Sequence, residues 1–152
     1  MGAPTLVDSN VLIDVISGDP TWESWSAAEL AGAAASGTVA INPVIYAEVS
    51  MGFARIESCE SALGALAIER REVPWPAAFL AGKAYLDYRR RGGGRRSPLP
   101  DFFVGAHAAV EGMRLLTRDP ARYRTYFPRL DLIAPGREPP TARRPAPPSP
   151  AR

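Results

Sequence analysis

Short apolar runs alternate along the chain with longer stretches in which apolar residues recur at helical spacing. The runs predict strands at residues 5–8, 39–41, 73–75, 115–117 and 130–133. The longer stretches predict helices at residues 10–17, 21–36, 43–53, 58–71, 76–88, 101–112 and 120–127. Strands that alternate with helices favour right-handed crossovers and a sheet covered by helices on both faces. The predicted fold class is therefore α/β, a three-layer α/β/α sandwich with a mostly parallel central sheet.

Residues at the predicted helix ends support several of these boundaries. Asn42-Pro43 is typical of an N-cap followed by proline at the first helical position. Thr21 is expected to cap the second helix, and Gly37 to end it in a left-handed conformation. Residues 89–100, with the sequence RRRGGGRRSPLP, are expected to form a basic loop that leads into the helix beginning at Asp101.

The last eighteen residues differ in composition from the rest of the chain. Seven of residues 135–152 are proline, and no periodic pattern of apolar residues continues there. We therefore predict one domain at residues 1–134 and a Pro/Arg-rich, disordered tail at residues 135–152. The tail holds four arginines and one glutamate, so residues 1–134 carry 14 basic and 15 acidic residues. The net charge of +2 thus gives no argument for nucleic-acid binding by the domain itself.

The overall composition is that of a globular domain, with 46% hydrophobic and 22% charged residues. No apolar run approaches the ~20 residues of a membrane-spanning helix, and no secretory signal pattern precedes the first predicted strand. We therefore expect a cytoplasmic protein with no membrane association. Cys59 is the single cysteine, which excludes an internal disulfide and a metal site built from several thiolates.

Four carboxylates lie where a parallel sheet gathers its loops. Asp8 ends the first strand, Asp101 lies in the first turn of its helix, and Asp119 follows the strand at 115–117. Glu48 lies about a turn and a half into its helix, where side chains lean back toward the N-terminus. Open α/β sheets bind ligands beyond the carboxyl ends of their strands, so we expect the four acids to converge there. Because an aspartate before a helix is more often only a cap, Asp8 has weight only together with the other three.

A cluster of carboxylates with no positive charge beside it is unfavourable, because like charges raise each other's pKa. A divalent cation removes this repulsion. Ligands that are all oxygen, without histidine or cysteine, indicate Mg²⁺ or Mn²⁺ rather than zinc. Such ions act most often on phosphates, where they activate water and stabilise charge on a phosphodiester. The residues therefore favour a metal-dependent enzyme acting on phosphate esters.

Four segments of the chain resemble, in order, the motifs of PIN-domain ribonucleases. They are LVDSN at 6–10, IYAEV at 45–49, LPDFFVGAHA at 99–108 and LTRD at 116–119. The chain length, and the closing Tyr126-Phe127-Pro128 before the last predicted strand, are most similar to the VapC toxins of bacterial toxin–antitoxin pairs. The resemblance covers about residues 5–134.

The resemblance implies a Mg²⁺- or Mn²⁺-dependent endoribonuclease that hydrolyses RNA with a metal-activated water and leaves a 5′-phosphate and a 3′-hydroxyl. It also implies inhibition by a cognate antitoxin protein and a homodimer. The catalytic, metal-binding acids would be Asp8, Glu48, Asp101 and Asp119. Asp8 and Asp101 would be the direct ligands, whereas the position of Asp119 is the most variable in the family.

Other polar residues have supporting or alternative roles. Asn10 and Thr117 match polar positions that orient the carboxylates by hydrogen bonds. The candidate contacts to the RNA backbone are Arg89, Arg90, Arg91, Arg95, Arg96 and Arg118. The alternative for the run at 89–91 is a solvated helix end, because cations favour the C-terminal dipole. Arg118 and Arg122 could equally pair with carboxylates.

Three further predictions concern residues outside the acidic set. His107, the only histidine, is expected to be packed or surface-polar rather than catalytic. Asp14 is expected to be solvated. Tyr123 and Tyr126 are expected to pack in the core rather than to stack on bases.

Two other functions remain open at the level of the sequence. The first is a phosphatase with Asp8 as nucleophile, but that chemistry needs a second aspartate two residues later, where this chain has Asn10. The second is a PIN-fold module that binds RNA or protein without cleavage. Retention of four mutually repelling acids argues against such a module.

Overall fold

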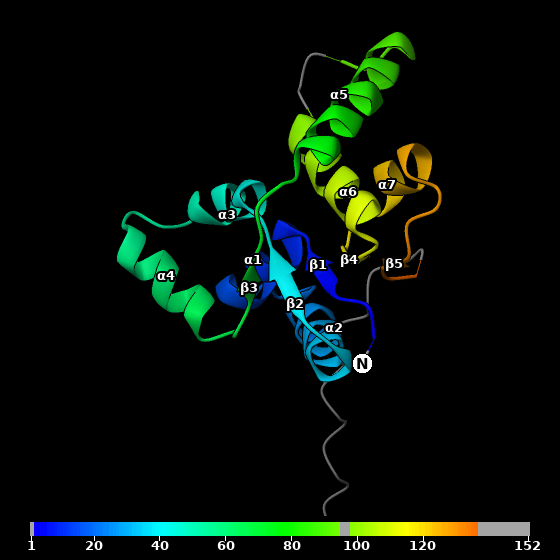
Figure 1. The fold of residues 1–152 in the computed structure, drawn as a ribbon. Helices are drawn as coiled ribbons and strands as arrows, with labels where there is room; N and C mark the ends of the chain where they lie inside the picture. The colour runs from blue at the N-terminus through cyan, green and yellow to red at the C-terminus, as the bar shows by residue number, and fades with distance from the viewer. Residues whose placement is uncertain (1, 95–97, 137–152) are drawn as a thin grey trace, which may run out of the picture.

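The computed structural model describes residues 2–94 and 98–136, so Arg95, Arg96 and residues 137–152 of the predicted tail lie outside the described residues. A parallel sheet of five strands, in the order β3-β2-β1-β4-β5, forms the centre of the fold (Figure 1). The strands are β1 (Thr5–Val7), β2 (Val39–Ile41), β3 (Glu69–Arg70), β4 (Arg114–Leu116) and β5 (Leu132–Ile133). In register, Leu6 of β1 lies beside Ala40 of β2 and Leu115 of β4. The predicted parallel sheet is confirmed.

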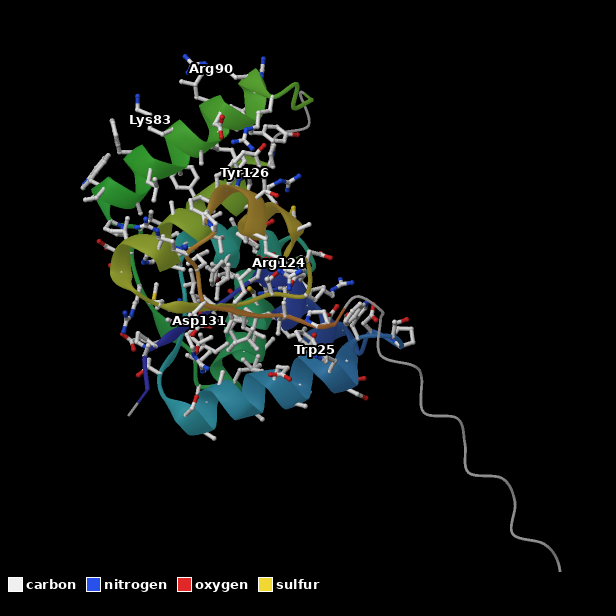
Figure 2. All side chains as sticks on the ribbon, turned by 90° about the vertical axis from the view of Figure 1, so that its right-hand side faces the viewer. Trp25, Lys83, Arg90, Arg124, Tyr126 and Asp131 are labelled. Carbon is white, nitrogen blue, oxygen red and sulfur yellow. The ribbon has the colours of Figure 1, made fainter. Side chains whose placement is uncertain are left out.

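Seven helices connect and cover the strands within the described part of the chain. They are α1 (Ser9–Ser17), α2 (Glu23–Ser36), α3 (Pro43–Ser50), α4 (Ile56–Gly64), α5 (Trp75–Arg90), α6 (Leu99–Glu111) and α7 (Ala121–Tyr126). Figure 2 shows α2 on one side of the sheet, with α6 and then α5 on the other. This arrangement is the predicted α/β/α sandwich. No helix among residues 2–94 and 98–136 is long and apolar enough to cross a membrane.

Local side-chain and backbone geometry explains where several helices begin. Asp8 caps α1 by accepting a hydrogen bond from the Ser9 amide at 2.9 Å. Asn42 caps α3 through the Ile45 amide, also at 2.9 Å, and Pro43 occupies the first turn as predicted. These caps need only a few adjacent residues, which is why the sequence pattern locates them.

The ends of α2 differ from the prediction. Thr21 does not cap its start, because the N-cap residue is Trp22 and no side chain caps the helix. In the turn before the helix, the Asp19 carboxylate accepts hydrogen bonds from the amides of Thr21 and Trp22 at 2.9 and 2.8 Å. The helix then begins at Glu23. Gly37 ends it with φ 169°, which is extended backbone and not the left-handed cap that was predicted.

The third strand lies earlier in the chain than predicted. The predicted helix at 58–71 ends at Gly64, and the strand that pairs with β2 is Glu69–Arg70 rather than 73–75. Both residues of β3 are exposed, so no apolar run marks it. The predicted helix at 43–53 also ends early, at Ser50, and the basic loop is shorter than expected because α5 continues through Arg90 and α6 begins at Leu99.

The core lies between the sheet and its helices. The central strands β1, β2 and β4 are buried except at Arg114, and Leu6, Val7, Ala40 and Leu115 are 0% exposed. Parallel strands with both faces covered are expected to be apolar throughout. The first residue after β1, Asp8, is therefore a carboxylate at the edge of a dry core.

Candidate acidic active site

Asp8 lies at the centre of the hydrogen-bond network beyond the carboxyl end of β1. Its side chain is 3% exposed. Oδ1 accepts the Ser9 amide, while Oδ2 accepts the hydroxyls of Thr117 at 2.8 Å and Tyr123 at 2.9 Å. These donors come from α1, from the segment after β4 and from α7. The carboxylate is thus fixed in one orientation by three separate parts of the fold.

Burial controls the acidity of Asp8. The pKa of Asp8 is raised from 3.8 to about 6. Desolvation is the main cause, and the neighbouring negative charge of Asp101 also contributes to the rise. The hydrogen bonds from Thr117, Tyr123 and the Ser9 amide act in the opposite direction because they stabilise the ionised form. A carboxyl group with this pKa is mostly ionised near neutral pH, and a cation that binds it displaces the remaining proton.

Asn10 and Thr117 connect Asp8 to Asp119. The Asn10 amide nitrogen lies 3.4 Å from Asp8 Oδ2, 3.3 Å from Thr117 Oγ1 and 3.3 Å from Asp119 Oδ2. Thr117 Oγ1 also accepts the Asp119 amide at 3.2 Å, and Asn10 Oδ1 accepts the Arg118 amide at 3.3 Å. The two polar residues singled out from the sequence therefore lie between the first and the fourth acid.

Asp101 projects from the first turn of α6 and pairs with the guanidinium of Arg122 on α7. Burial raises the pKa of Asp101, whereas the hydrogen bond and the charge of Arg122 lower it. The prediction that no positive charge lies beside the acids is therefore wrong for Asp101. The other acids have no ion pair with a cation among the described residues.

Glu48, on α3, is partly buried and is influenced by the same charges. Burial raises its pKa, and the charges of Asp8 and Asp101 raise it further. Its Oε1 atom is buried and has no hydrogen-bond partner in the part of the chain that the structure describes. A buried acceptor without a donor is costly, and a bound cation or water would satisfy it.

The four predicted acids thus interact electrostatically, but they do not form a compact ligand cage. Within residues 2–94 and 98–136, no three histidine, cysteine or acidic side chains are grouped so that they could hold a metal ion together. Mg²⁺ usually keeps several waters and uses only one or two protein carboxylates, so a cage is not required. The all-oxygen donor set, the raised pKa values and the unpartnered Glu48 oxygen fit a hydrated Mg²⁺ or Mn²⁺ ion.

Two residues at this site were not predicted as part of it. Tyr123 was expected only to pack, yet its hydroxyl donates a hydrogen bond to Asp8. Burial raises the pKa of Tyr123 well above 10, and the neighbouring negative charges raise it further. Arg122 was left open between phosphate and carboxylate, and it pairs with Asp101. Both lie on α7, and the only sequence signal is their closeness to Asp119.

Asp14 is buried rather than solvated, which corrects the prediction. It is 1% exposed, accepts a hydrogen bond from the Ser26 hydroxyl at 2.8 Å and lies 3.1 Å from Arg118 Nε. The Arg118 guanidinium also lies 5.5 Å from the centroid of the Trp22 ring. Arg118, a predicted RNA contact, is therefore engaged inside the protein, and its predicted role in RNA binding is not tested.

The remaining sequence candidates lie outside the hydrogen-bond network of Asp8. His107 is fully buried, which agrees with the predicted packed role and not with the surface-polar one. Its Nδ1 lies 3.0 Å from the Asn42 amide nitrogen, and its Nε2 lies 3.4 Å from Glu111. Burial lowers its pKa. Arg89, Arg90 and Arg91 are exposed at the end of α5 (Figure 2 labels Arg90), and their role in RNA binding stays a prediction.

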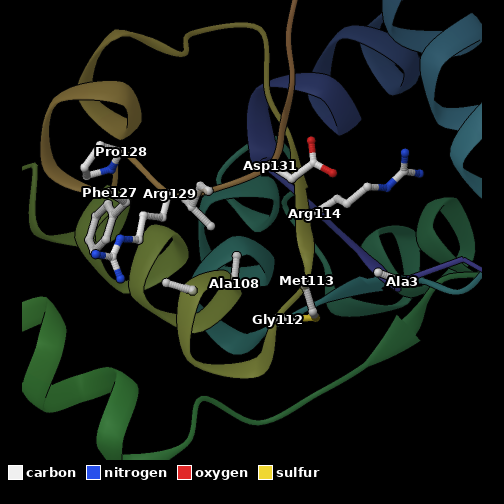
Figure 3. A pocket seen from close by; sticks show the side chains of 11 residues that line it. Ala3, Ala108, Gly112, Met113, Arg114, Phe127, Pro128, Arg129 and Asp131 are labelled. Atoms are coloured by element: carbon white, nitrogen blue, oxygen red, sulfur yellow. The ribbon is translucent and has the colours of Figure 1, made fainter.

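A cavity lies elsewhere in the described part of the structure. It has a volume of about 460 Å³ and is lined by residues around the starts of β1 and β4, including Ala3, Met113, Arg114 and Asp131 (Figure 3). Strand starts lie at the opposite edge of a parallel sheet from strand ends. This cavity is therefore separate from the acids, which lie at the carboxyl edge where α/β sheets bind ligands.

Comparison with known families decides what kind of domain carries these acids. The family model of the PIN domain matches residues 5–128. The chain belongs to the PIN domain family. No curated protein matches its sequence.

Solved structures similar to this PIN domain share its fold at low sequence identity. VapBC2 from Rickettsia felis, bound to a DNA fragment from its promoter, is 20% identical, with 88% of this chain and 99% of that chain covered and a TM-score of 0.69. VapBC-1 from nontypeable Haemophilus influenzae is 15% identical, with 86% and 97% covered and a TM-score of 0.64. VapBC-5 from Mycobacterium tuberculosis is 18% identical, with 88% and 98% covered and a TM-score of 0.54.

Proposed function

We propose that this PIN domain is a Mg²⁺- or Mn²⁺-dependent endoribonuclease of the VapC type, the toxin of a toxin–antitoxin pair. The observation that carries the proposal is the acidic site around Asp8, in which Asn10 and Thr117 connect Asp8 with Asp119. The site lies at the carboxyl edge of the sheet in a chain of the PIN family.

Asp8 and Asp101 would hold the cation, and Glu48 and Asp119 would complete its shell of ligands and waters. When bound, the cation supplies positive charge to a phosphodiester and lowers the pKa of a bound water. Thr117, Tyr123 and the Ser9 amide fix the Asp8 carboxylate, so that no reorientation is needed when the ion arrives. The same donors limit the rise in the pKa of Asp8 that burial causes.

Exposed cations at the end of α5 are the proposed contacts to RNA. Arg89 and Arg90 lie in the last turn of α5, and Arg91 follows at its end. Arg91 forms an ion pair with Asp87 at 3.1 Å. Its guanidinium also lies 5.4 Å from the centroid of the ring of Tyr126, which belongs to α7, the helix that carries Arg122. Guanidinium groups bind phosphates through paired hydrogen bonds, which suits contacts to the RNA backbone.

An antitoxin protein and a second copy of this chain are the proposed partners. The similar solved structures include VapBC and toxin–antitoxin complexes. Large apolar side chains are exposed at two places on this chain. Met51 follows the end of α3 and Ile56 begins α4, whereas Trp75 and Phe79 lie on α5. Exposed apolar groups of this kind favour protein interfaces. We propose the cytoplasm, where RNA is available, as the site of action.

The first experiment is RNA cleavage by the purified, antitoxin-free protein with Mg²⁺, Mn²⁺ or EDTA. We expect metal-dependent cuts that leave 5′-phosphate ends, and their loss in Asp8→Asn and Asp101→Asn. The matched control is Asp131→Asn, because Asp131 is an exposed aspartate beside the cavity at the opposite edge of the sheet.

Two outcomes would contradict this function. Cleavage that survives EDTA and both substitutions would indicate a contaminating nuclease. A toxic effect in cells that survives Asp8→Asn would favour a non-catalytic module that binds RNA or protein.

A further inference from the structure

Arg122 makes direct contact with one of the proposed metal ligands. Its guanidinium pairs with Oδ2 of Asp101, and it lies 5.8 Å from the centroid of the Tyr88 ring. Both partners are accessible to solvent, since the side chains of Arg122 and Asp101 are 37% and 30% exposed. The pair therefore lies at the rim of the site, where an exchange of partners does not require the core to open.

The other acids of the site are held differently. Asp8 accepts hydrogen bonds from neutral donors, including the hydroxyls of Thr117 and Tyr123. Arg118 is adjacent to Asp119 in the chain, yet its guanidinium pairs with the buried Asp14. Among the described residues, Arg122 is the one cation in an ion pair with an acid of the proposed set.

A guanidinium and a divalent cation at Asp101 exclude each other. Both need the negative charge of the same carboxylate, and their own positive charges repel at short distance. The Tyr88 ring offers Arg122 a second favourable contact, because a guanidinium is attracted to the face of an aromatic ring. Arg122 makes this contact while it is paired with Asp101, and it can keep the contact when it leaves the carboxylate.

We propose that Arg122 is the counter-ion of Asp101 in the metal-free protein and competes with the divalent cation for this carboxylate. The inference rests on the proposed metal-dependent function and adds a regulatory property to it. Arg122 compensates the charge of Asp101 in the empty site, and it raises the concentration of metal at which the site fills. It is a positioning residue, since it acts through Asp101.

The test measures metal binding without RNA or turnover. Full-length protein is stripped of metal, and Mn²⁺ is titrated into it by calorimetry. We expect Arg122→Gln to bind Mn²⁺ about five- to tenfold more tightly than the wild type, because a partly exposed pair with a charge-assisted hydrogen bond is removed. Arg122→Met, whose side chain still packs against Tyr88, should show the same gain and serves as a second variant if Arg122→Gln is unstable.

The matched control is Arg124→Gln. Arg124 (labelled in Figure 2) is exposed and lies on the same helix as Arg122. Its replacement by glutamine changes the net charge by the same amount as Arg122→Gln. It should leave Mn²⁺ affinity unchanged. In an Asp101→Asn background, Arg122→Gln should no longer tighten Mn²⁺ binding, because its effect passes through the Asp101 carboxylate.

The outcomes separate this inference from the proposed function. Equal Mn²⁺ affinity in Arg122→Gln and Arg124→Gln, or weaker binding in Arg122→Gln, would overturn the competition while leaving a metal site in place. If the wild type and all variants fail to bind Mn²⁺, both the competition and the metal-dependent function are wrong.

Discussion

Tyr123 has a more direct effect on the acidic site than its apolar surroundings suggest. Its side chain is 2% exposed, and its hydroxyl lies 2.9 Å from Asp8 Oδ2. A buried tyrosine normally needs a hydrogen-bond partner. Here the partner is a carboxylate, and the bond stabilises the ionised form of Asp8.

Replacing Tyr123 by phenylalanine should raise the pKa of Asp8 above its present value of about 6. The proton then competes more strongly with a cation, so Mn²⁺ affinity near neutral pH should fall and its pH midpoint should move upward. Calorimetric titrations between pH 5 and pH 8 would measure this. Tyr126→Phe is the control, because Tyr126 lies on the same helix with its ring 5.1 Å from that of Phe102. An unchanged midpoint in Tyr123→Phe would contradict the prediction.

The pKa of Asp8 also predicts how stability depends on pH in the metal-free protein. In the unfolded chain the group ionises near 3.8, but in the folded protein it ionises near 6. Between these values the folded state binds more protons than the unfolded state. The contribution of Asp8 to the free energy of unfolding is therefore fully present below pH 3.8 and is lost as the pH rises through 6. The loss amounts to about 3 kcal/mol, at 1.36 kcal/mol per pKa unit.

Asp8→Asn should lack this dependence, since asparagine does not titrate and still caps a helix well. Urea unfolding in EDTA at several pH values would compare the two proteins. The stability of the wild type relative to Asp8→Asn should decrease from pH 4 to pH 6 and then stay constant. A constant difference across this range would show that Asp8 ionises normally in the fold.

At the scale of the elements, the contact between α6 and α7 determines where Tyr123 and Arg122 lie. Gly105 of α6 faces this contact. A Cβ atom at Gly105 would lie 2.6 Å from ring atoms of Phe127 and 3.1 Å from Cδ1 of Tyr123. Phe127 and Tyr123 are both buried, so their rings have little room to move. The glycine therefore allows the close approach that brings α7 to the acids.

Gly105→Ala should destabilise the protein by about 1–3 kcal/mol through overpacking. It should also weaken Mn²⁺ binding, because Tyr123 must shift away from Asp8. Gly82→Ala is the matched control on the exposed face of α5, where a new Cβ meets nothing within 4 Å. That substitution should leave stability unchanged or raise it by up to about 1 kcal/mol. Equal urea midpoints for the two variants would show that the α6–α7 contact adapts to the added methyl group.

At the scale of the whole molecule, Asp14 connects the first two helices with the segment that carries Asp119. Asp14 belongs to α1, Ser26 to α2, and Arg118 to the segment after β4. The Arg118 amide also donates to Asn10 of α1. The position of Asp119 in the site thus depends on helices that are about a hundred residues away in the chain.

Asp14→Ala should destabilise the fold by about 2–3 kcal/mol, because Arg118 loses its partner and the buried Ser26 hydroxyl loses its acceptor. Asp87→Ala is the control, because Asp87 of α5 makes an exposed ion pair with Arg91, which follows the end of the helix. This substitution should lower the free energy of unfolding by at most about 0.5 kcal/mol. Thermal or urea unfolding would measure both. A loss in Asp14→Ala as small as in Asp87→Ala would mean that the buried pair contributes little.

The sequence by itself determined the elements whose signals are local. The buried strands β1, β2 and β4, the cap and proline that begin α3, and the order of the four acids could all be predicted from it. A cap needs only its neighbours, and a strand buried on both faces must be apolar. The positions of Asp8, Asp101 and Asp119 near the ends of strands and helices, and of Glu48 within its helix, followed from the same patterns, while their roles stay predictions.

Only the tertiary structure decided the rest, because it depends on contacts between distant segments. β3 is exposed, and what identifies it is its backbone pairing with β2. Asp14 resembles a solvated helical residue in the sequence, yet α2 and Arg118 enclose it. Tyr123 reaches Asp8 across 115 residues, and Arg122 reaches Asp101, because α7 packs against α6 at Gly105. The packing of α7, which no local pattern encodes, thus brings to the site the groups that oppose the effect of burial on the pKa of Asp8 and Asp101.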